Sequence, residues 1–319
     1  MERPRVLLTE PIHPDGLALL QQSADVTVLP APEPEAVRAA LADADAVVVR
    51  LVRLRAEEID AAPRLRVIGR HGVGVDNVDL AAATRRRIPV VYTPGANAVS
   101  VAEHTLALLL AVARRLVDLD RAVREGRWQA RDEIWGIELA GRTAGVVGVG
   151  AVGREVARRC RALGMRVLGY DPYVAEMPEG VERAESLDDL LRQCDVVSLH
   201  VPLRPDTRHL IGRRELAILR PGSVLINTSR GAVVDEGALA EALADGRLAG
   251  AGLDVFGTEP PPPDHPLLRA PRAVLTPHAA SHTGEALRRM AVAVAEQVLD
   301  ALAGRRPPYV ANPEVYQTS

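Results

Sequence analysis

Three short segments each contribute one side chain suited to acid–base chemistry on a small carboxylic acid. They are NTSRG at 227–231 with Arg230, LDVFGTEP at 253–260 with Glu259, and TPHAA at 276–280 with His278. An arginine can hold a carboxylate and polarise a carbonyl, an imidazole can exchange a hydroxyl proton near neutral pH, and a carboxylate can orient that imidazole. Together these groups meet the needs of hydride transfer between a hydroxyl-bearing carbon and a carbonyl.

Other interpretations of these side chains are weaker. A single Arg, Glu or His is more often a surface or capping residue, but three of them at the ends of three successive strands favour a common function. His278 and His282 have the i, i+4 spacing of metal ligands, and Glu285 could join them. Because Pro277 precedes the first histidine and a helix is expected to start after it, we predict no metal site.

A glycine pattern predicts a dinucleotide-binding turn. Gly148 and Gly150 end the apolar run AGVVGVG (144–150), and Gly153 lies in the following segment, which has helical apolar spacing. The first glycine permits a tight turn, the second lets a pyrophosphate approach the backbone, and the third allows close helix-to-sheet contact. The N–H groups of Ala151 and Val152 at the start of that helix would then bind phosphate oxygens.

Asp171 ends the next predicted strand, where a carboxylate can accept hydrogen bonds from ribose hydroxyls. The same carboxylate repels a 2′-phosphate, so the sequence favours NAD over NADP. Arg161 and Arg166 lie nearby and leave some tolerance of NADP open. An Asp that merely caps a neighbouring turn is the alternative.

The composition excludes several classes of protein. A length of 319 residues predicts two domains, and a net charge of −3 gives no reason to expect binding to nucleic acid or anionic lipid. The sequence has no lysine, which rules out a Schiff-base or P-loop lysine. The absence of an N-terminal signal-like stretch and of any long uninterrupted apolar run predicts a cytoplasmic protein with no membrane span. Cys160 and Cys194 are expected to be buried thiols.

Short β-branched runs alternate with helical stretches through most of the chain, which predicts two doubly wound parallel sheets. The expected strands are 6–8, 26–29, 47–49, 67–68 and 90–92 in a first series, then 144–149, 166–170, 196–200, 223–227, 251–254 and 273–275 in a second. An apolar helix is expected over 100–117 with Ser100 as its N-cap, and a last helix over 285–302. We predict a Rossmann cofactor domain at 99–283, inserted into a flavodoxin-like substrate domain made of 1–98 and 284–319, with the active site between them.

These motifs resemble the D-isomer-specific 2-hydroxyacid dehydrogenase family, most closely its phosphoglycerate-dehydrogenase-like branch. The matching stretches run nearly end to end: RHGVGVDNVDL (70–80), TPGANAVSVAEHTLALLL (93–110), GVVGVGAVGREVA (145–157), NTSRGAVVDEGAL (227–239), AGLDVFGTEP (251–260) and LTPHAASHTGEA (275–286). The resemblance implies an NAD-dependent oxidoreductase that moves a hydride to or from C2 of a D-2-hydroxy acid or 2-keto acid.

The resemblance also assigns roles to single residues. It implies that Arg230 holds substrate, that His278 is the proton donor or acceptor, and that Glu259 pairs with His278. The further implied contacts are the backbone of Val73 and Gly74 for the substrate carboxylate, Thr228 and Asp254 for the nicotinamide, and Val201 for the cofactor cleft. Independently of the resemblance, the glycines around Val73 could form an anion-binding turn, or only a plain turn.

The sequence leaves the substrate open. Arg50 and Arg70 resemble positions that hold phosphate in phosphoglycerate dehydrogenases, which makes 3-phosphoglycerate one candidate. His71 and Val73 depart from the Ala and Thr more common there, so glyoxylate, hydroxypyruvate or a longer 2-keto acid stay open. A non-catalytic NAD-sensing corepressor is an alternative from another class, but a pure sensor has no need of the acid–base pair.

A formate dehydrogenase is disfavoured because that reaction transfers no proton to a group such as His278. The resemblance implies a homodimer. Trp128 and Trp135 flank a short connector, and they pack either on it or across such a dimer contact.

Overall fold

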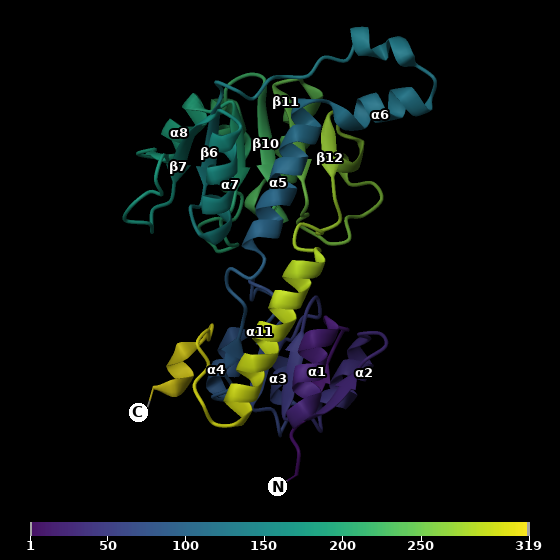
Figure 1. The fold of residues 1–319 in the computed structure, drawn as a ribbon, viewed down its shortest axis with the longest axis vertical. Helices are drawn as coiled ribbons and strands as arrows, with labels where there is room; N and C mark the ends of the chain where they lie inside the picture. Colours follow the sequence, from purple (N-terminus) through teal and green to yellow (C-terminus); the bar gives the residue numbers. More distant parts are fainter. Residues whose placement is uncertain (1, 318–319) are drawn as a thin grey trace. The chain divides into compact units, whose positions relative to one another are not determined.

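The computed structural model describes residues 2–317, which form two compact units (Figure 1). One unit comprises the residues up to Asn97 and those from His282 onward, and the other comprises Ala98–Ser281. These limits lie within two residues of the predicted ones. The chain therefore leaves the first unit, completes the second, and returns.

The first unit contains a five-stranded parallel sheet in the order β2-β1-β3-β4-β5. Its strands are β1 (Arg5–Leu8), β2 (Asp25–Val28), β3 (Ala46–Val49), β4 (Val67–Arg70) and β5 (Val90–Val91), and its helices are α1 (Pro14–Ser23), α2 (Pro34–Leu41), α3 (Ala56–Asp60), α4 (Leu80–Arg85) and α11 (Gly284–Leu302). This order is that of flavodoxin-like sheets, as predicted. The AVVV run of β3 is buried throughout because helices cover both faces of the sheet.

Apolar side chains of α1 and α11 pack on one face of this sheet, and those of α2, α3 and α4 pack on the other. The predicted last helix is confirmed as α11. Thr283 is its N-cap, and the Thr283 hydroxyl accepts a hydrogen bond from Ala286 N at 3.2 Å. Within residues 2–317, no helix combines the length and apolar character that a bilayer crossing requires.

The second unit contains a seven-stranded parallel sheet in the order β12-β11-β10-β9-β6-β7-β8. Its strands are β6 (Thr143–Val147), β7 (Arg166–Tyr170), β8 (Glu182–Arg183), β9 (Val196–Leu199), β10 (Ser223–Asn227), β11 (Leu248–Leu253) and β12 (Ala273–Leu275). The sheet reverses its order between β6 and β9, as a Rossmann fold does. Six strands were predicted. Sequence reasoning missed β8 because it is only two residues long, exposed and charged.

Helices cover both faces of this second sheet (Figure 1). Apolar side chains of α5 (Ala98–Ala113) and α7 (Ala151–Ala162) form one core with the strands, and those of α8 (Leu187–Gln193), α9 (Arg213–Ile218) and α10 (Glu236–Ala244) form the other. Cys160 and Cys194 are buried in these cores, and burial raises the pKa of each thiol to about 12. Both thiols are buried, as predicted.

The ends of the predicted apolar helix were wrong. The helix α5 begins at Ala98, so Ser100 lies inside its first turn and is not the N-cap. It ends at Ala113, and the chain then turns at Arg115, whose φ is +53°, into α6 (Leu116–Arg124). The Arg115 Nε donates to Asp118 Oδ2 at 2.6 Å across this turn. The break escaped prediction because apolar residues continue on both sides of it.

Candidate active site

The three predicted catalytic residues follow three neighbouring strands of the second sheet. Arg230 comes after β10, Glu259 after β11 and His278 after β12, and these strands pair in that order. Because the strands are parallel, their carboxyl ends meet at one edge of the sheet, where open α/β sheets bind ligands. Strand order thus gathers side chains that lie far apart in sequence.

Glu259 and His278 form a hydrogen-bonded pair. His278 Nδ1 and Glu259 Oε2 are 2.7 Å apart, and the other carboxylate oxygen accepts from Phe256 N at 3.0 Å. Burial raises the pKa of the Glu259 carboxyl, but the bonds from His278 and Phe256 and the charge of Arg230 outweigh burial and hold that pKa below its usual value. Glu259 therefore stays a carboxylate at neutral pH and fixes the tautomer of His278 with its proton on Nδ1.

The backbone of His278 has a left-handed conformation, with a φ of +52°. Such a conformation is uncommon outside glycine and persists only where neighbouring contacts stabilise it. Asp254 stabilises it through hydrogen bonds to the backbone around His278. Its carbonyl accepts from His278 N at 2.7 Å, and its carboxylate accepts from Ala279 N at 2.8 Å and from Ala280 N at 2.9 Å.

Asp254 is fully buried, and Thr276 also donates to its carboxylate at 2.6 Å. Burial raises the pKa of Asp254, but the hydrogen bonds from His104, Thr276 and the two backbone N–H groups outweigh burial and lower it. The sequence resemblance had assigned this residue only to the nicotinamide. A carboxylate at the end of an apolar strand was the available signal for a structural role.

Arg230 is partly buried and stands at the start of a well-ordered turn. Asn227 Oδ1 accepts from Ser229 N at 3.0 Å, and Asn227 Nδ2 donates to Arg230 O at 2.9 Å. Arg230 Nη1 donates to Ser229 O at 2.8 Å. The positive charge of Arg230 contributes to lowering the pKa of Glu259.

The glycine turn has the geometry that its spacing predicts. Gly148 has a φ of +88°, and a Cβ on Gly153 would lie 2.0 Å from Gly148 O. A Cβ on Gly150 would meet nothing within 4 Å, so the space above this glycine is open. Among residues 2–317, no side chain caps the start of α7, so the N–H groups of Ala151 and Val152 can bind an anion. These features fit a dinucleotide pyrophosphate.

Asp171 follows β7 beside this turn. Its carboxylate accepts from Val149 N at 2.9 Å and from Tyr173 N at 3.0 Å, one bond to each oxygen. Each oxygen keeps a second lone pair for a ribose hydroxyl. Arg166 is paired with Glu182, and Arg161 donates to Glu179 O at 2.7 Å, so both nearby arginines have other partners.

The two remaining cofactor candidates also belong to the second unit. Val201 follows β9, and its Cγ1 lies 3.0 Å from where a Cβ on Gly148 would be. Thr228 follows β10 and is buried, with its hydroxyl 2.9 Å from the hydroxyl of Thr105 on α5. Val201 therefore lies against the glycine turn, and Thr228 lies two residues before Arg230.

Apart from Arg230, the predicted substrate-binding residues belong to the first unit: Arg50 follows β3, Arg70 ends β4, and Val73 and Gly74 follow β4. Arg70 Nε donates to Gly74 O at 2.7 Å, and Nη1 donates to His71 O. Arg70 thus braces the turn that holds Val73 and Gly74. Val73 is 37% exposed, and Arg50 Nη1 donates to Pro11 O at 2.8 Å.

Glu10 was missed by sequence reasoning. Its buried carboxylate accepts from the backbone N–H groups of Arg50 at 3.1 Å, Leu51 at 2.7 Å and Val52 at 3.1 Å. A carboxylate here therefore shapes the loop that presents Arg50. The signal in the sequence was an acidic residue two positions after an apolar strand.

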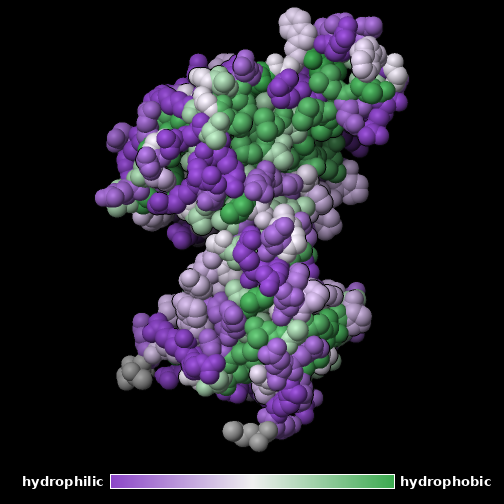
Figure 2. Space-filling model, viewed as in Figure 1, coloured by the Kyte–Doolittle hydropathy of each residue, from purple (hydrophilic) through white to green (hydrophobic). Residues whose placement is uncertain are grey.

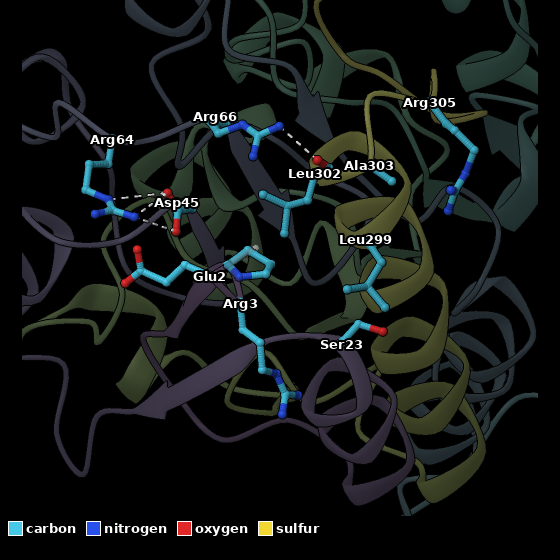
Figure 3. A pocket seen from close by; sticks show the side chains of 11 residues that line it. Glu2, Arg3, Ser23, Asp45, Arg64, Arg66, Leu299, Leu302, Ala303 and Arg305 are labelled. Carbon is cyan, nitrogen blue, oxygen red and sulfur yellow. Dashed lines mark hydrogen bonds and ion pairs between the residues drawn. The ribbon is translucent and has the colours of Figure 1, made fainter.

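A separate hollow of about 610 Å³ lies at the amino edge of the first sheet (Figure 3). Four arginines line it, but they serve the structure: Arg64 pairs with Asp45, and Arg66 donates to Leu302 O at 2.8 Å. Arg3 donates to Ala24 O at 3.1 Å. Two of these bonds satisfy carbonyls where α1 and α11 end, so we assign no ligand to this hollow.

Fold and site together define a dinucleotide-binding α/β protein with an Arg, His and Glu set at the sheet edge. Residues 106–280 match the model of the D-isomer specific 2-hydroxyacid dehydrogenase NAD-binding domain. The chain belongs to this family, which confirms the family prediction and NAD as the cofactor.

Curated relatives include two kinds of enzyme. A D-3-phosphoglycerate dehydrogenase of Methanocaldococcus jannaschii is 41% identical over 97% of this chain and 59% of its own length. A glyoxylate reductase of Korarchaeum cryptofilum is 43% identical over 98% of this chain and 97% of its own length. The chain thus spans about six tenths of the phosphoglycerate dehydrogenase.

Solved structures give the same fold. The TT0316 protein from Thermus thermophilus has a TM-score of 0.88 with 41% identity, covering 96% of this chain and 99% of its own. This similarity confirms the prediction of two parallel-sheet α/β domains.

Proposed function

We propose that this protein is an NAD-dependent oxidoreductase that interconverts a D-2-hydroxy acid and its 2-keto acid. The 2.7 Å bond between His278 and Glu259, at the sheet edge that also presents Arg230, carries the proposal. An oriented imidazole beside a guanidinium is suited to exchange a proton with a substrate oxygen while the guanidinium holds the charge.

When bound, NADH would supply the hydride to C2 and NAD+ would accept it from C2. In the reductive direction, His278 Nε2–H donates a proton to the forming hydroxyl, and the Glu259 carboxylate stabilises the charged imidazole through Nδ1. Arg230 pairs with the substrate carboxylate and polarises the carbonyl. Thr228 and Asp254 are proposed to orient the nicotinamide, and Asp171 to accept the adenosine ribose hydroxyls. The backbone of Val73 and Gly74 is proposed to bind the substrate carboxylate.

We favour a small, unphosphorylated 2-keto acid, such as glyoxylate or hydroxypyruvate, as the substrate. Arg70 already donates to a carbonyl of its own turn, which engages part of its guanidinium. Beside Arg50, the loop presents the apolar side chain of Leu51, which is 73% exposed and offers nothing to a phosphate. Phosphohydroxypyruvate is the second candidate, because Arg50 is only partly buried.

The test is the oxidation of NADH with a panel of 2-keto acids that includes phosphohydroxypyruvate, followed at the NADH absorbance band. Turnover with any member supports the oxidoreductase and argues against a non-catalytic NAD sensor. Arg50→Ala is expected to raise KM for phosphohydroxypyruvate and leave glyoxylate nearly unchanged if the phosphate is bound there. Absence of turnover with the whole panel, in a protein that binds NADH, would contradict the proposal.

We also propose a homodimer. Large apolar side chains are exposed around α6 and the segment after it, where Leu116 is 51%, Trp128 63% and Trp135 78% exposed. Figure 2 shows apolar surface gathered over the neighbouring helix α5. Exposed apolar patches of this kind mark interfaces between proteins. Size-exclusion chromatography with light scattering is expected to give twice the 34.2 kDa chain mass, and a monomer would contradict this proposal.

A further inference from the structure

The loop between β11 and the short helix at Pro266–Arg269 carries Glu259 and has no helix or strand of its own. Glu259 can pair with His278 only if this loop keeps its shape. Two contacts hold the loop at points on either side of Glu259. Gly257 N donates to Glu236 Oε1 at 2.9 Å, and His265 Nε2 lies 3.2 Å from Glu236 Oε2.

From these contacts we infer that Glu236 and His265 form a clamp that positions Glu259 and Arg230 relative to each other. The clamp is defined as these two side chains and their bonds to each other and to Gly257. The inference rests on the proposed function, since it assigns positioning residues for that reaction. Both residues act on the Glu259–His278 pair through the loop, and the sequence motifs gave neither of them a role.

Glu236 links two segments that the reaction must keep in register. It is the first residue of α10, which the chain reaches six residues after Arg230. One carboxylate on α10 therefore binds both parts of the loop that carries Glu259. Its side chain is 18% exposed and that of His265 is 13% exposed, so water competes little for these bonds.

Close backbone packing completes the link. A Cβ on Gly231 would lie 1.9 Å from the carbonyl carbon of Phe256 and 2.2 Å from Gly257 N. The residue after Arg230 thus lies directly on the loop, three residues before Glu259. If the loop that carries Glu259 shifted, it would either push Gly231, and with it Arg230, or lose its contact with Gly231.

The chemistry of the pair fixes the proton on His265. A carboxylate only accepts hydrogen bonds, so His265 Nε2 carries a proton and its N–H donates a hydrogen bond to Glu236. Within residues 2–317, the buried Nδ1 of His265 has no hydrogen-bond partner. The ring also packs edge-on against Phe256, with centroids 5.8 Å apart. His265 therefore acts on the loop through one hydrogen bond and one ring contact.

These contacts predict a specific kinetic phenotype. Glu236→Ala is expected to lower kcat for the best keto acid by about 10- to 100-fold, the scale of a small misplacement of catalytic groups. The KM for NADH is expected to change less than about twofold, because the glycine turn and Asp171 lie on other strands. The acid limb of the kcat/KM profile is expected to move to higher pH, because a loose loop no longer holds Glu259 against Phe256 N and His278.

Two matched variants make the test specific. Glu236→Gln keeps an oxygen for Gly257 N but turns an NH2 group toward His265 Nε2, so it is expected to recover only part of the lost activity. Glu241→Ala removes an exposed carboxylate, paired with Arg213, from the same helix and is expected to behave as the parent.

If Glu236→Ala does not fold, as judged by circular dichroism and NADH binding, His265→Phe carries the test. Phenylalanine keeps the ring contact with Phe256 but has no N–H, so a fall in kcat of about 3- to 10-fold with unchanged KM for NADH supports the clamp.

The inference fails if a folded Glu236→Ala, or His265→Phe in its place, has the kcat and pH profile of the parent. It also fails if the loss is equal in Glu241→Ala. These outcomes are measured against a parent enzyme that turns over a keto acid, so they are distinct from failure of the proposed function, in which the parent itself is inactive.

Discussion

Replacing Glu259 by glutamine is the most direct perturbation of the proposed acid–base pair, since it changes one atom and removes one charge. The carboxylate accepts two hydrogen bonds, from His278 Nδ1 at 2.7 Å and from Phe256 N at 3.0 Å. An amide has only one oxygen. In Glu259→Gln, either the NH2 group faces the Phe256 N–H, or it faces Nδ1 and forces that atom to act as an acceptor.

The expected loss follows from this geometry. A hydrogen bond to a charged group contributes about 1.5–3 kcal/mol, and screening by solvent reduces this because the two side chains are 40% and 37% exposed. A net loss of about 1–2 kcal/mol corresponds to a fall of about 5- to 30-fold in kcat/KM. The reductive direction is expected to suffer most, because it needs the protonated imidazole that the carboxylate stabilises.

The assay is keto acid reduction at saturating NADH, with kcat/KM measured across pH for the parent and Glu259→Gln. His278→Ala serves as the reference for complete loss of the acid–base group, with an expected fall of about 10²- to 10⁴-fold. If Glu259→Gln had the rate and the pH profile of the parent, the pairing would have no part in the reaction.

Three further predictions concern single positions. Gly231→Ala would bring a Cβ to 1.9 Å from the carbonyl carbon of Phe256, and turnover is expected to fall more than about 10²-fold, measured in a variant that still binds NADH. Asp254→Asn would place an NH2 group against a buried donor and is expected to lower the free energy of unfolding by about 1–3 kcal/mol in thermal melts at neutral pH. Hydrogen bonds outweigh burial and depress the pKa of Asp254, so the charged carboxylate stabilises the folded protein at neutral pH and loses this contribution as the pH falls. The stability difference between parent and Asp254→Asn should therefore shrink when the pH drops below 3.8, the ordinary pKa of an aspartate. Asp171→Asn removes the charge beside the ribose site and keeps an acceptor for Val149 N, and it should raise the ratio of kcat/KM for NADPH over NADH by about 10-fold, or about 1.4 kcal/mol. An unchanged ratio would contradict the assignment of Asp171.

Much of the architecture could be predicted because its signals are local. Buried parallel strands read as short β-branched runs, and the glycine turn needs glycine at Gly148 and Gly153 for reasons of backbone geometry alone. The ends of α5 and the existence of β8 were not predictable in this way. The apolar pattern continues across the turn at Arg115, and β8 is too short and too polar to have a pattern.

The chain by itself determined the types of the reacting groups and their order, because Arg230, Glu259 and His278 each follow a strand that the sequence reveals. Tertiary structure alone decided which groups meet. The adjacency of β10, β11 and β12 brings Glu259 to His278, and the clamp of Glu236 and His265 depends on a contact between residues 29 positions apart. Such contacts leave no periodic trace in a sequence, because their free energy depends on distance and burial in the folded state. The same holds for Asp254, whose charge the sequence gives and whose support of the His278 turn only the fold creates.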